Sequence, residues 1–349
     1  MSPTTRAFTD RLGIALPIVQ APMAGFQAGR LAAAAGAAGA LASLPGAALD
    51  ARRLADESAL VRAAGVPVNL NFFCHAVPAP DAERQRAWRA VLAPYYAELG
   101  VDPATIQEGP GRLPFGDEAL DAVLTLAPAV VSFHFGLPAA AIVTRLQQSG
   151  AQVWASATTV DEARWLDERG VDAVIAQGLE AGGHRGMFLT DDLTTQLGTY
   201  ALVPQVVAAV KVPVIAAGGV ADAKGVAAAL ALGAAAVQVG TAFLRCPEAT
   251  TSGPHRAALA SPAAAHTACT NLFSGRPARG IVNRLMRDLG CMRADVPPFP
   301  TAVNALAPLR AAAEARGIGD CSPLWSGQNA GGARDVPAAD IVRGLAARL

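Results

Sequence analysis

Residues 212–241 read VPVIAAGGVADAKGVAAALALGAAAVQVGT and hold two short apolar runs with a helical segment between them. The runs, at residues 212–217 and 235–239, are continuously apolar, as expected for strands that are buried on both faces of a parallel sheet. The segment between them, at residues 221–232, has helical spacing and is followed by Gly233. The stretch therefore predicts one strand–helix–strand unit of a parallel α/β fold.

The same rhythm extends back to the start of the chain. Six further apolar runs are predicted to be strands, at residues 18–21, 39–43, 67–72, 129–133, 152–157 and 173–177. A helix is clearest at residues 160–169, where Thr159 can cap its start and Gly170 follows its end. Eight such repeats favour a (β/α)8 TIM barrel, and the 349 residues suit one barrel domain with additions. A doubly wound sheet is the alternative, because counting strands cannot separate the two folds.

Two stretches break this rhythm. Residues 75–127 contain repeated prolines and a basic helical piece at residues 81–91. We expect a helical insertion there, between the third and fourth strands. Residues 246–349 are rich in Pro and Arg, with helical pieces near residues 256–260 and 305–315. We expect this second stretch to be a C-terminal extension that closes the barrel mouth.

Composition and charge exclude several classes of partner. The formal net charge is zero and the arginines are scattered, so we expect neither a nucleic-acid partner nor an anionic membrane partner. No uninterrupted apolar run is long enough to span a membrane, and we see no secretory signal at the N-terminus. The five cysteines are odd in number and widely spaced, without a C-x-x-C pair. We therefore expect no disulfide framework, no metal site and a cytoplasmic location.

Polar residues and glycines follow the predicted strands, at the end of a barrel where function normally resides. Gly218 and Gly219 follow the seventh strand, and Gln238 to Thr241 end the eighth. In barrels these two loops often bind phosphate, because glycine lets backbone N–H groups approach the oxygens and a hydroxyl such as that of Thr241 can add a donor. Tight turns alone would also explain such glycines, but two of these loops at both expected positions favour phosphate.

His184 lies in the sequence GGHRG at residues 182–186. A histidine on a glycine loop after a strand can serve as a general base. A surface histidine on a flexible loop is an equally consistent interpretation. His134 follows the fourth strand and can be either a donor that orients substrate or a packed histidine between Phe133 and Phe135. Arg185 receives no assignment from the sequence.

Five motifs together resemble the nitronate monooxygenase family, formerly called 2-nitropropane dioxygenases. They are QAPMAG at residues 20–25, SFHFGLP at 132–138, AQGLEAGGHRG at 176–186, PVIAAGGVAD at 213–222 and QVGTAFL at 238–244. The resemblance implies a TIM barrel that binds FMN without a covalent link and uses His184 as the catalytic base. The FMN contacts that it implies are Met23, Asn71, Gln177, Gly182, Gly218, Gly219, Gln238, Val239, Gly240 and Thr241. His134 and Phe72 are the candidate substrate-pocket residues.

The implied reaction oxidises alkyl nitronates with O2 to carbonyl compounds and nitrite. Propionate 3-nitronate is the expected substrate at the level of the family, with nitroalkane detoxification as the role. The physiological substrate, the use of neutral nitroalkanes and the oligomeric state are left open by the sequence.

Two other functions remain as alternatives. An FMN-dependent NAD(P)H reductase, of the enoyl-ACP reductase or quinone reductase type, shares the glycine–histidine loop and the double-glycine loop. Residues 132–138 favour the nitronate enzyme over the reductase. A non-catalytic phosphate-ligand-binding barrel is the alternative from another class, and the colour of the purified protein separates it from a flavoenzyme.

Overall fold

The computed structural model describes residues 1–106, 109 and 111–349. In these residues eight parallel strands form one sheet, in the order β1-β9-β8-β6-β5-β4-β3-β2. The strands are β1 (Ile18–Gln20), β2 (Ala42–Leu44), β3 (Val68–Phe73), β4 (Val130–His134), β5 (Gln152–Ala157), β6 (Ala173–Gln177), β8 (Val214–Ala217) and β9 (Ala236–Val239). A parallel bridge between Val19 and Leu41 joins the two edges of the sheet. The sheet is therefore a barrel, and the doubly wound alternative is wrong.

Each predicted strand is present, and the second one is displaced along the chain. It was expected at residues 39–43, but β2 begins at Ala42. Gly39 has a φ of 100°, which is a left-handed conformation, and its N–H donates to the carbonyl of Gly36. Gly39 therefore belongs to the turn before the strand, because a glycine adopts this conformation without the steric penalty of a side chain.

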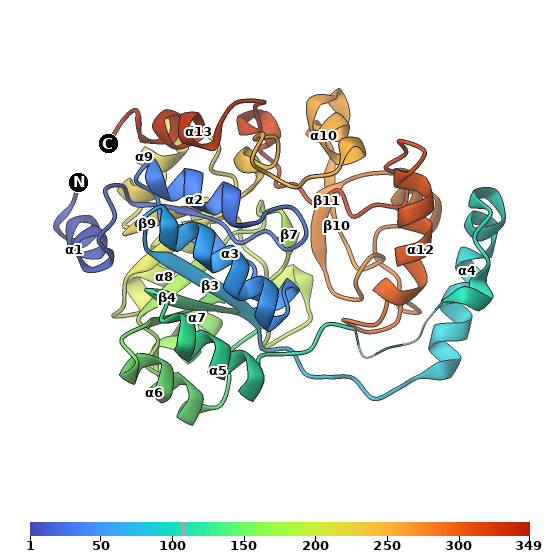
Figure 1. The fold of residues 1–349 in the computed structure, drawn as a ribbon, viewed down its shortest axis with the longest axis horizontal. Helices are drawn as coiled ribbons and strands as arrows, with labels where there is room; N and C mark the ends of the chain where they lie inside the picture. The colour runs from blue at the N-terminus through green and yellow to red at the C-terminus, as the bar shows by residue number, and fades with distance from the viewer. Residues whose placement is uncertain (107–108, 110) are drawn as a thin grey trace.

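Helices surround the barrel and cover its outer face (Figure 1). They are α2 (Gly29–Ala37), α3 (Ala51–Ala63), α5 (Asp117–Leu126), α6 (Ala140–Gln148), α7 (Val160–Asp167), α8 (Thr199–Ala209), α9 (Ala223–Ala231) and α13 (Ala338–Ala346). Alternate strand residues, such as Val153 and Val174, pack against these helices. The residues between them, such as Trp154 and Ile175, form a second core with α1 (Pro3–Leu12), where the ring of Phe8 lies 5.5 Å from that of Trp154. This two-faced burial explains the continuously apolar strands.

A lobe stands beside the barrel and is built from two distant parts of the chain. The structure places α4 (Ala82–Leu99), which lies between β3 and β4, against α12 (Val303–Glu314) near the C-terminus (Figure 1). Trp88 and Leu92 of α4 share a core with Leu306 and Leu309 of α12. The remaining elements of the second half are α10 (Gly253–Ala260), β10 (Thr267–Thr270), β11 (Ala278–Ile281) and α11 (Arg284–Leu289). We call α4, β10, β11, α11 and α12 the side lobe.

The described residues also form short 3-10 helices: η1 (Gly46–Ala48), η2 (Pro103–Thr105), η3 (Leu193–Thr195), η4 (Thr241–Phe243), η5 (Pro262–Ala265) and η6 (Ala330–Gly332). The division into one domain, an insertion at 75–127 and an extension at 246–349 stays a prediction, and residues 107, 108 and 110 of that insertion lie outside the described residues. Across the part of the chain that is described, no helix is both long enough and apolar enough to cross a bilayer.

Candidate active site

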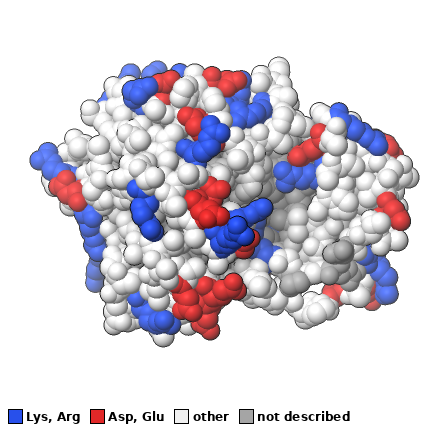
Figure 2. Space-filling view, in the orientation of Figure 1, with Lys and Arg blue, Asp and Glu red and all other residues white. Residues whose placement is uncertain are grey.

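A cavity of about 940 Å³ lies at the carboxyl ends of the barrel strands, where residues of the side lobe complete its wall. Figure 2 shows the molecule hollowed between the barrel and the side lobe. The sequence-predicted residues that line this cavity are Met23, Asn71, Phe72, His134, Gln177, Gly182, His184, Gly218, Gly219, Gln238, Gly240 and Thr241. Val239 is the exception, because its side chain is buried in the core between the barrel and its helices.

The two glycine loops that follow β8 and β9 form one side of the cavity. Gly218 and Gly219 have φ angles of 115° and 71°, which L-amino acids with side chains rarely adopt. A Cβ atom at Gly218 would also lie 2.9 Å from the hydroxyl oxygen of Thr199. The hydroxyl of Thr241 accepts a hydrogen bond of 2.9 Å from the N–H of Gly327, so its own hydrogen is available to a ligand. These loops therefore offer close backbone approach and a hydroxyl donor.

Two amide side chains lie at the barrel end of the cavity. The Nδ2 of Asn71 donates to the hydroxyl of Ser132 at 2.9 Å and to its carbonyl at 3.2 Å. The Oε1 of Gln238 is buried and has no hydrogen-bond partner in the described protein. A buried acceptor without a partner is costly. Gln238 is therefore suited to a ligand that brings an N–H or O–H donor.

His184 is held by a short strand, β7 (Gly183–His184), rather than by a flexible loop. This strand pairs antiparallel with β11, with His184 opposite Ala278. The Nε2 of His184 lies 2.9 Å from the hydroxyl of Ser274. The side chain of Gln177 donates to the carbonyl of His184 at 2.9 Å and accepts from the N–H of Gly186 at 2.8 Å. Both the backbone and the ring of His184 are thus fixed.

Aromatic rings surround the imidazole of His184. The ring centroids at 5.3–6.1 Å belong to Phe299, Trp325, Phe135 and Phe73. Burial among them lowers the pKa of His184 well below its usual value, and the cations Arg112 and Arg276 lower it further. The imidazole is therefore neutral at neutral pH and can accept a proton.

His134 uses both of its ring nitrogens within the protein. Because a carbonyl can only accept, Nε2 must donate in the 3.1 Å bond to the carbonyl of His184. Nδ1 then accepts from the hydroxyl of Ser156 at 2.9 Å. Burial lowers the pKa of His134 to about 4, so it stays in this neutral form. The geometry favours His134 as a packed residue that positions the backbone of His184.

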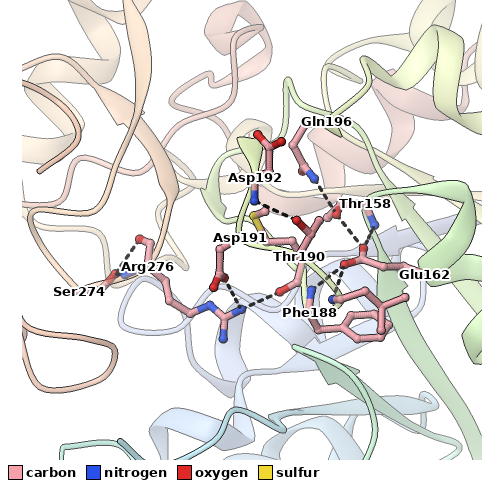
Figure 3. A network of polar contacts seen from close by, with 11 residues as sticks. Thr158, Glu162, Phe188, Thr190, Asp191, Asp192, Gln196, Ser274 and Arg276 are labelled. Carbon is pink, nitrogen blue, oxygen red and sulfur yellow. Dashed lines mark hydrogen bonds and ion pairs between the residues drawn. The ribbon is translucent and has the colours of Figure 1, made fainter. Parts of the chain in front are cut away.

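A buried carboxylate fixes the segment that follows His184 (Figure 3). Glu162 of α7 is fully buried and accepts from the N–H and hydroxyl of Thr158, both at 2.7 Å, and from the N–H of Phe188 at 2.6 Å. From the opposite side, a guanidinium nitrogen of Arg276 donates to the carbonyl of Met187 at 2.7 Å. Residues 187–188 are therefore tied to a barrel helix and to the side of the cavity that carries Ser274.

Arg185, which received no role from the sequence, is a buried structural residue. Its side chain is fully buried and donates to the carbonyls of Gln177 and Gly178, both at 2.7 Å, and to the side-chain oxygen of Gln196. Burial lowers the pKa of Arg185 to about 10, which still leaves it charged at neutral pH. The guanidinium joins the end of β6 to the loop that follows it.

Comparisons with known proteins agree with this arrangement. The family model described as nitronate monooxygenase matches residues 5–347. The chain belongs to the nitronate monooxygenase family. It is 42% identical to a nitronate monooxygenase of Pseudomonas aeruginosa, with 99% of each chain covered. Among solved structures it is similar to a nitroalkane oxidase of Streptomyces ansochromogenes, with 39% identity, a TM-score of 0.89 and coverage of 98% and 97%. It is also similar to FabK of Thermotoga maritima, at 26% identity, a TM-score of 0.72 and coverage of 97% and 94%.

In this member of the nitronate monooxygenase family, several cavity residues escaped the sequence-based prediction. Phe72 lines the cavity, as the sequence predicts, and its ring packs on that of Phe115 at 4.8 Å, but the neighbour of His184 is Phe73. The alternation of side chains along a strand could have found this, because Asn71 and Phe73 share one face. Four further residues had no such signal and come from the irregular segments: Arg112, Ser274, Phe299 and Trp325.

Within residues 1–106, 109 and 111–349, no group of three or more His, Cys, Asp or Glu could hold a metal ion. The site that the structure assembles is a histidine in an aromatic wall that shares one cavity with two glycine loops.

Proposed function

We propose that this chain is an FMN-dependent nitronate monooxygenase that oxidises alkyl nitronates with O2 to carbonyl compounds and nitrite. One observation carries the proposal: His184, held by Ser274 and by strand pairing, shares a single cavity with the glycine loops after β8 and β9. Membership of the nitronate monooxygenase family and the named relatives support the same substrate class. Propionate 3-nitronate and neutral nitroalkanes are the substrates to test after simple alkyl nitronates.

The cavity fits FMN in size and chemistry. Its volume of about 940 Å³ lies within the range of small-molecule and cofactor sites. The unpartnered Oε1 of Gln238 suits a donor on a planar heterocycle, and the glycine loops suit a phosphate. The residues that we propose hold FMN are Met23, Asn71, Gln177, Gly182, Gly218, Gly219, Gln238, Gly240 and Thr241, with Val239 contributing its backbone alone. Bound flavin supplies the redox chemistry, taking electrons from the substrate and delivering them to O2.

The chain's own residues handle protons and orientation. The carbon next to a nitro group is acidic, and the neutral imidazole of His184 accepts its proton. The hydroxyl of Ser274 holds the ring, while His134 and Gln177 hold the backbone carbonyl of the same residue. The surrounding aromatic rings make the environment of the imidazole less polar, which strengthens the electrostatic interactions in the site.

Reduction of the bound flavin under anaerobic conditions tests the function directly. The purified protein is mixed in a stopped-flow instrument with ethyl nitronate, nitroethane or NADH, and the flavin absorbance is followed. We expect prompt bleaching by the nitronate and none by NADH, then nitrite release once O2 is added. Bleaching by NADH alone would establish the reductase alternative. A colourless protein that cannot be reconstituted with FMN would establish the non-catalytic barrel.

Replacing His184 tests its role as base. His184→Asn should retain flavin but lose roughly 100-fold or more of its rate on neutral nitroethane, since a positioned general base contributes about 10²–10⁴-fold. Preformed ethyl nitronate needs no deprotonation and should lose far less. The exposed His266 provides the matched control, His266→Asn. A parental rate of His184→Asn on nitroethane would show that the base is another group.

We propose in addition that the protein works in a reducing compartment such as the cytoplasm. All five cysteines are free thiols, and burial raises the pKa of Cys246 to about 12, which protects it from reaction. Cell fractionation with an antibody against the chain tests this location, and recovery from an oxidising compartment would contradict it.

A further inference from the structure

Arg112 presents an unpaired positive charge to the cavity. Its side chain is half-buried and lines the same cavity as His184. The guanidinium lies over the ring of Phe73, 5.1 Å from the centroid, and that ring lies 6.1 Å from the ring of His184. Among the residues that the structure describes, no carboxylate or other acceptor bonds to this guanidinium.

The backbone around Arg112 is anchored to the end of β3. Since a carbonyl only accepts, the Nε2 of the buried His75 donates to the carbonyl of Arg112 at 2.9 Å. The N–H of Phe115 donates to the carbonyl of Phe73 at 2.8 Å. These two bonds, at Arg112 itself and three residues later at Phe115, fix this backbone, and the contact with the ring of Phe73 positions the guanidinium.

The other arginines near His184 are committed elsewhere. Arg310 lines the cavity but bonds to Glu314 at 2.9 Å. Arg276 lies over the ring of Phe135 and donates to the carbonyl of Met187. Arg112 is therefore the cavity-lining arginine, among those described, whose guanidinium is left for a ligand. Burial lowers the pKa of Arg112, because the charged guanidinium is less well solvated in the cavity wall than in water. A bound anion would offset this loss of solvation.

We propose that Arg112 binds the charged oxygens of the nitronate and makes this site favour anionic nitronates over neutral nitroalkanes. The inference deepens the proposed function and rests on it. A nitronate and its nitroalkane differ by one proton, and the nitronate spreads its negative charge over two oxygens in one plane. A guanidinium matches such a planar pair with two parallel N–H donors. A neutral nitro group offers the same shape without the charge, so it gains much less from this residue.

The test compares Arg112→Gln and Arg112→Lys with a control at an exposed arginine of α4 that does not line the cavity, Arg86→Gln, in the flavin-loaded protein. The measurements are kcat/KM for ethyl nitronate and for nitroethane, and the Kd of nitrate, a planar anion that does not react, followed through the flavin spectrum. Losing a hydrogen bond to a charged group weakens binding about 10- to 100-fold. We expect Arg112→Gln to show this loss for nitronate and nitrate, with nitroethane changed less than about threefold. Arg112→Lys should be intermediate, and Arg86→Gln close to the parent.

Two results would overturn the inference. One is a nitrate Kd and a nitronate kcat/KM for Arg112→Gln within about twofold of the parent. The other is an equal loss for nitronate and nitroethane, which would make Arg112 a general structural residue. If the parental protein does not turn over any nitronate, the proposed function fails, and the nitrate Kd still decides whether Arg112 binds an anion. Flavin content and melting temperature of Arg112→Lys identify a variant that has merely failed to fold.

Discussion

The substitution Gly182→Ala is expected to push residues 326–328, near the C-terminus, away from the barrel. A Cβ atom at Gly182 would lie 2.5 Å from the nitrogen of Gly327 and 2.6 Å from the carbonyl carbon of Ser326. Both are backbone atoms, which cannot move aside as the end of a side chain can. The segment is also fastened, because Gly327 donates to Thr241 and Gln328 donates to the carbonyl of Glu180, each at 2.9 Å. Gly182→Ala must therefore displace the backbone of residues 326–328, although two hydrogen bonds hold it in place.

The size of the effect follows from these contacts. Overpacking costs about 1–3 kcal/mol, and weakening the two hydrogen bonds of this segment costs about 0.5 kcal/mol each. We expect a loss of about 2–4 kcal/mol in the free energy of unfolding. For a chain of this length, 1 kcal/mol corresponds to about 1–2 °C, so the melting temperature should fall by roughly 3–6 °C. Gly182 and Gly327 both line the cavity, so FMN should also dissociate faster.

The neighbouring glycine provides a matched control. Gly183 has a φ of 72°, and a Cβ atom there would meet nothing within 4 Å. Gly183→Ala should therefore cost only the left-handed strain of about 1–2 kcal/mol. Thermal unfolding followed by circular dichroism, with flavin release on dilution, separates the two variants. The reasoning is refuted if Gly182→Ala melts within about 1 °C of the parent, or if Gly183→Ala is the more damaged of the two.

Three further predictions concern buried polar groups. Arg185→Lys cannot serve all the acceptors of the guanidinium and should lower the free energy of unfolding by about 3 kcal/mol, measured in urea; a change below about 1 kcal/mol would contradict this. Glu162→Gln turns an NH2 group towards N–H donors such as that of Phe188, so the loop should become sensitive to limited proteolysis, and unchanged resistance would count against its anchoring role. His134 and His255 each have a pKa lowered by burial to about 4, so the unfolded chain binds protons more readily than the folded one below pH 6.5. Between pH 7 and 5 the free energy of unfolding should fall by about 2 kcal/mol for each histidine, and equal stability at both pH values would show that neither is buried in neutral form.

The sequence predicted the barrel well because its signals are local. Each strand is buried on both faces and therefore reads as one apolar run, as in residues 152–157, which form β5 from end to end. Helix limits followed capping residues, and Thr159 does accept from the N–H of Glu162 at the start of α7. The glycine loops were found because positive φ angles, such as those of Gly218 and Gly219, require glycine.

The part of the candidate site that was not predicted from the sequence depends on contacts between segments that are distant along the chain. β11 pairs with His184 from a position far along the chain, and nothing in GGHRG indicates a strand. α4 continues past the expected end at Val91 and through Pro94 to Leu99, because burial against α12 outweighs the local signal of the proline. The cation of Arg112 comes from the Pro-rich insertion, where local patterns carry little information about position.

The pairing of β7 with β11 also sets when the enzyme can first work during its synthesis. All eight barrel strands have been synthesised once Val239 is made, yet the partner strand at Ala278–Ile281 and the hydroxyl of Ser274 do not yet exist. A nascent chain that ends there has the sequence of every barrel strand but lacks the groups that support the imidazole of His184. At typical elongation speeds the supporting strand follows the histidine by on the order of ten seconds. Until then, His184 lacks both the strand pairing and the hydroxyl contact that hold it in the full-length chain.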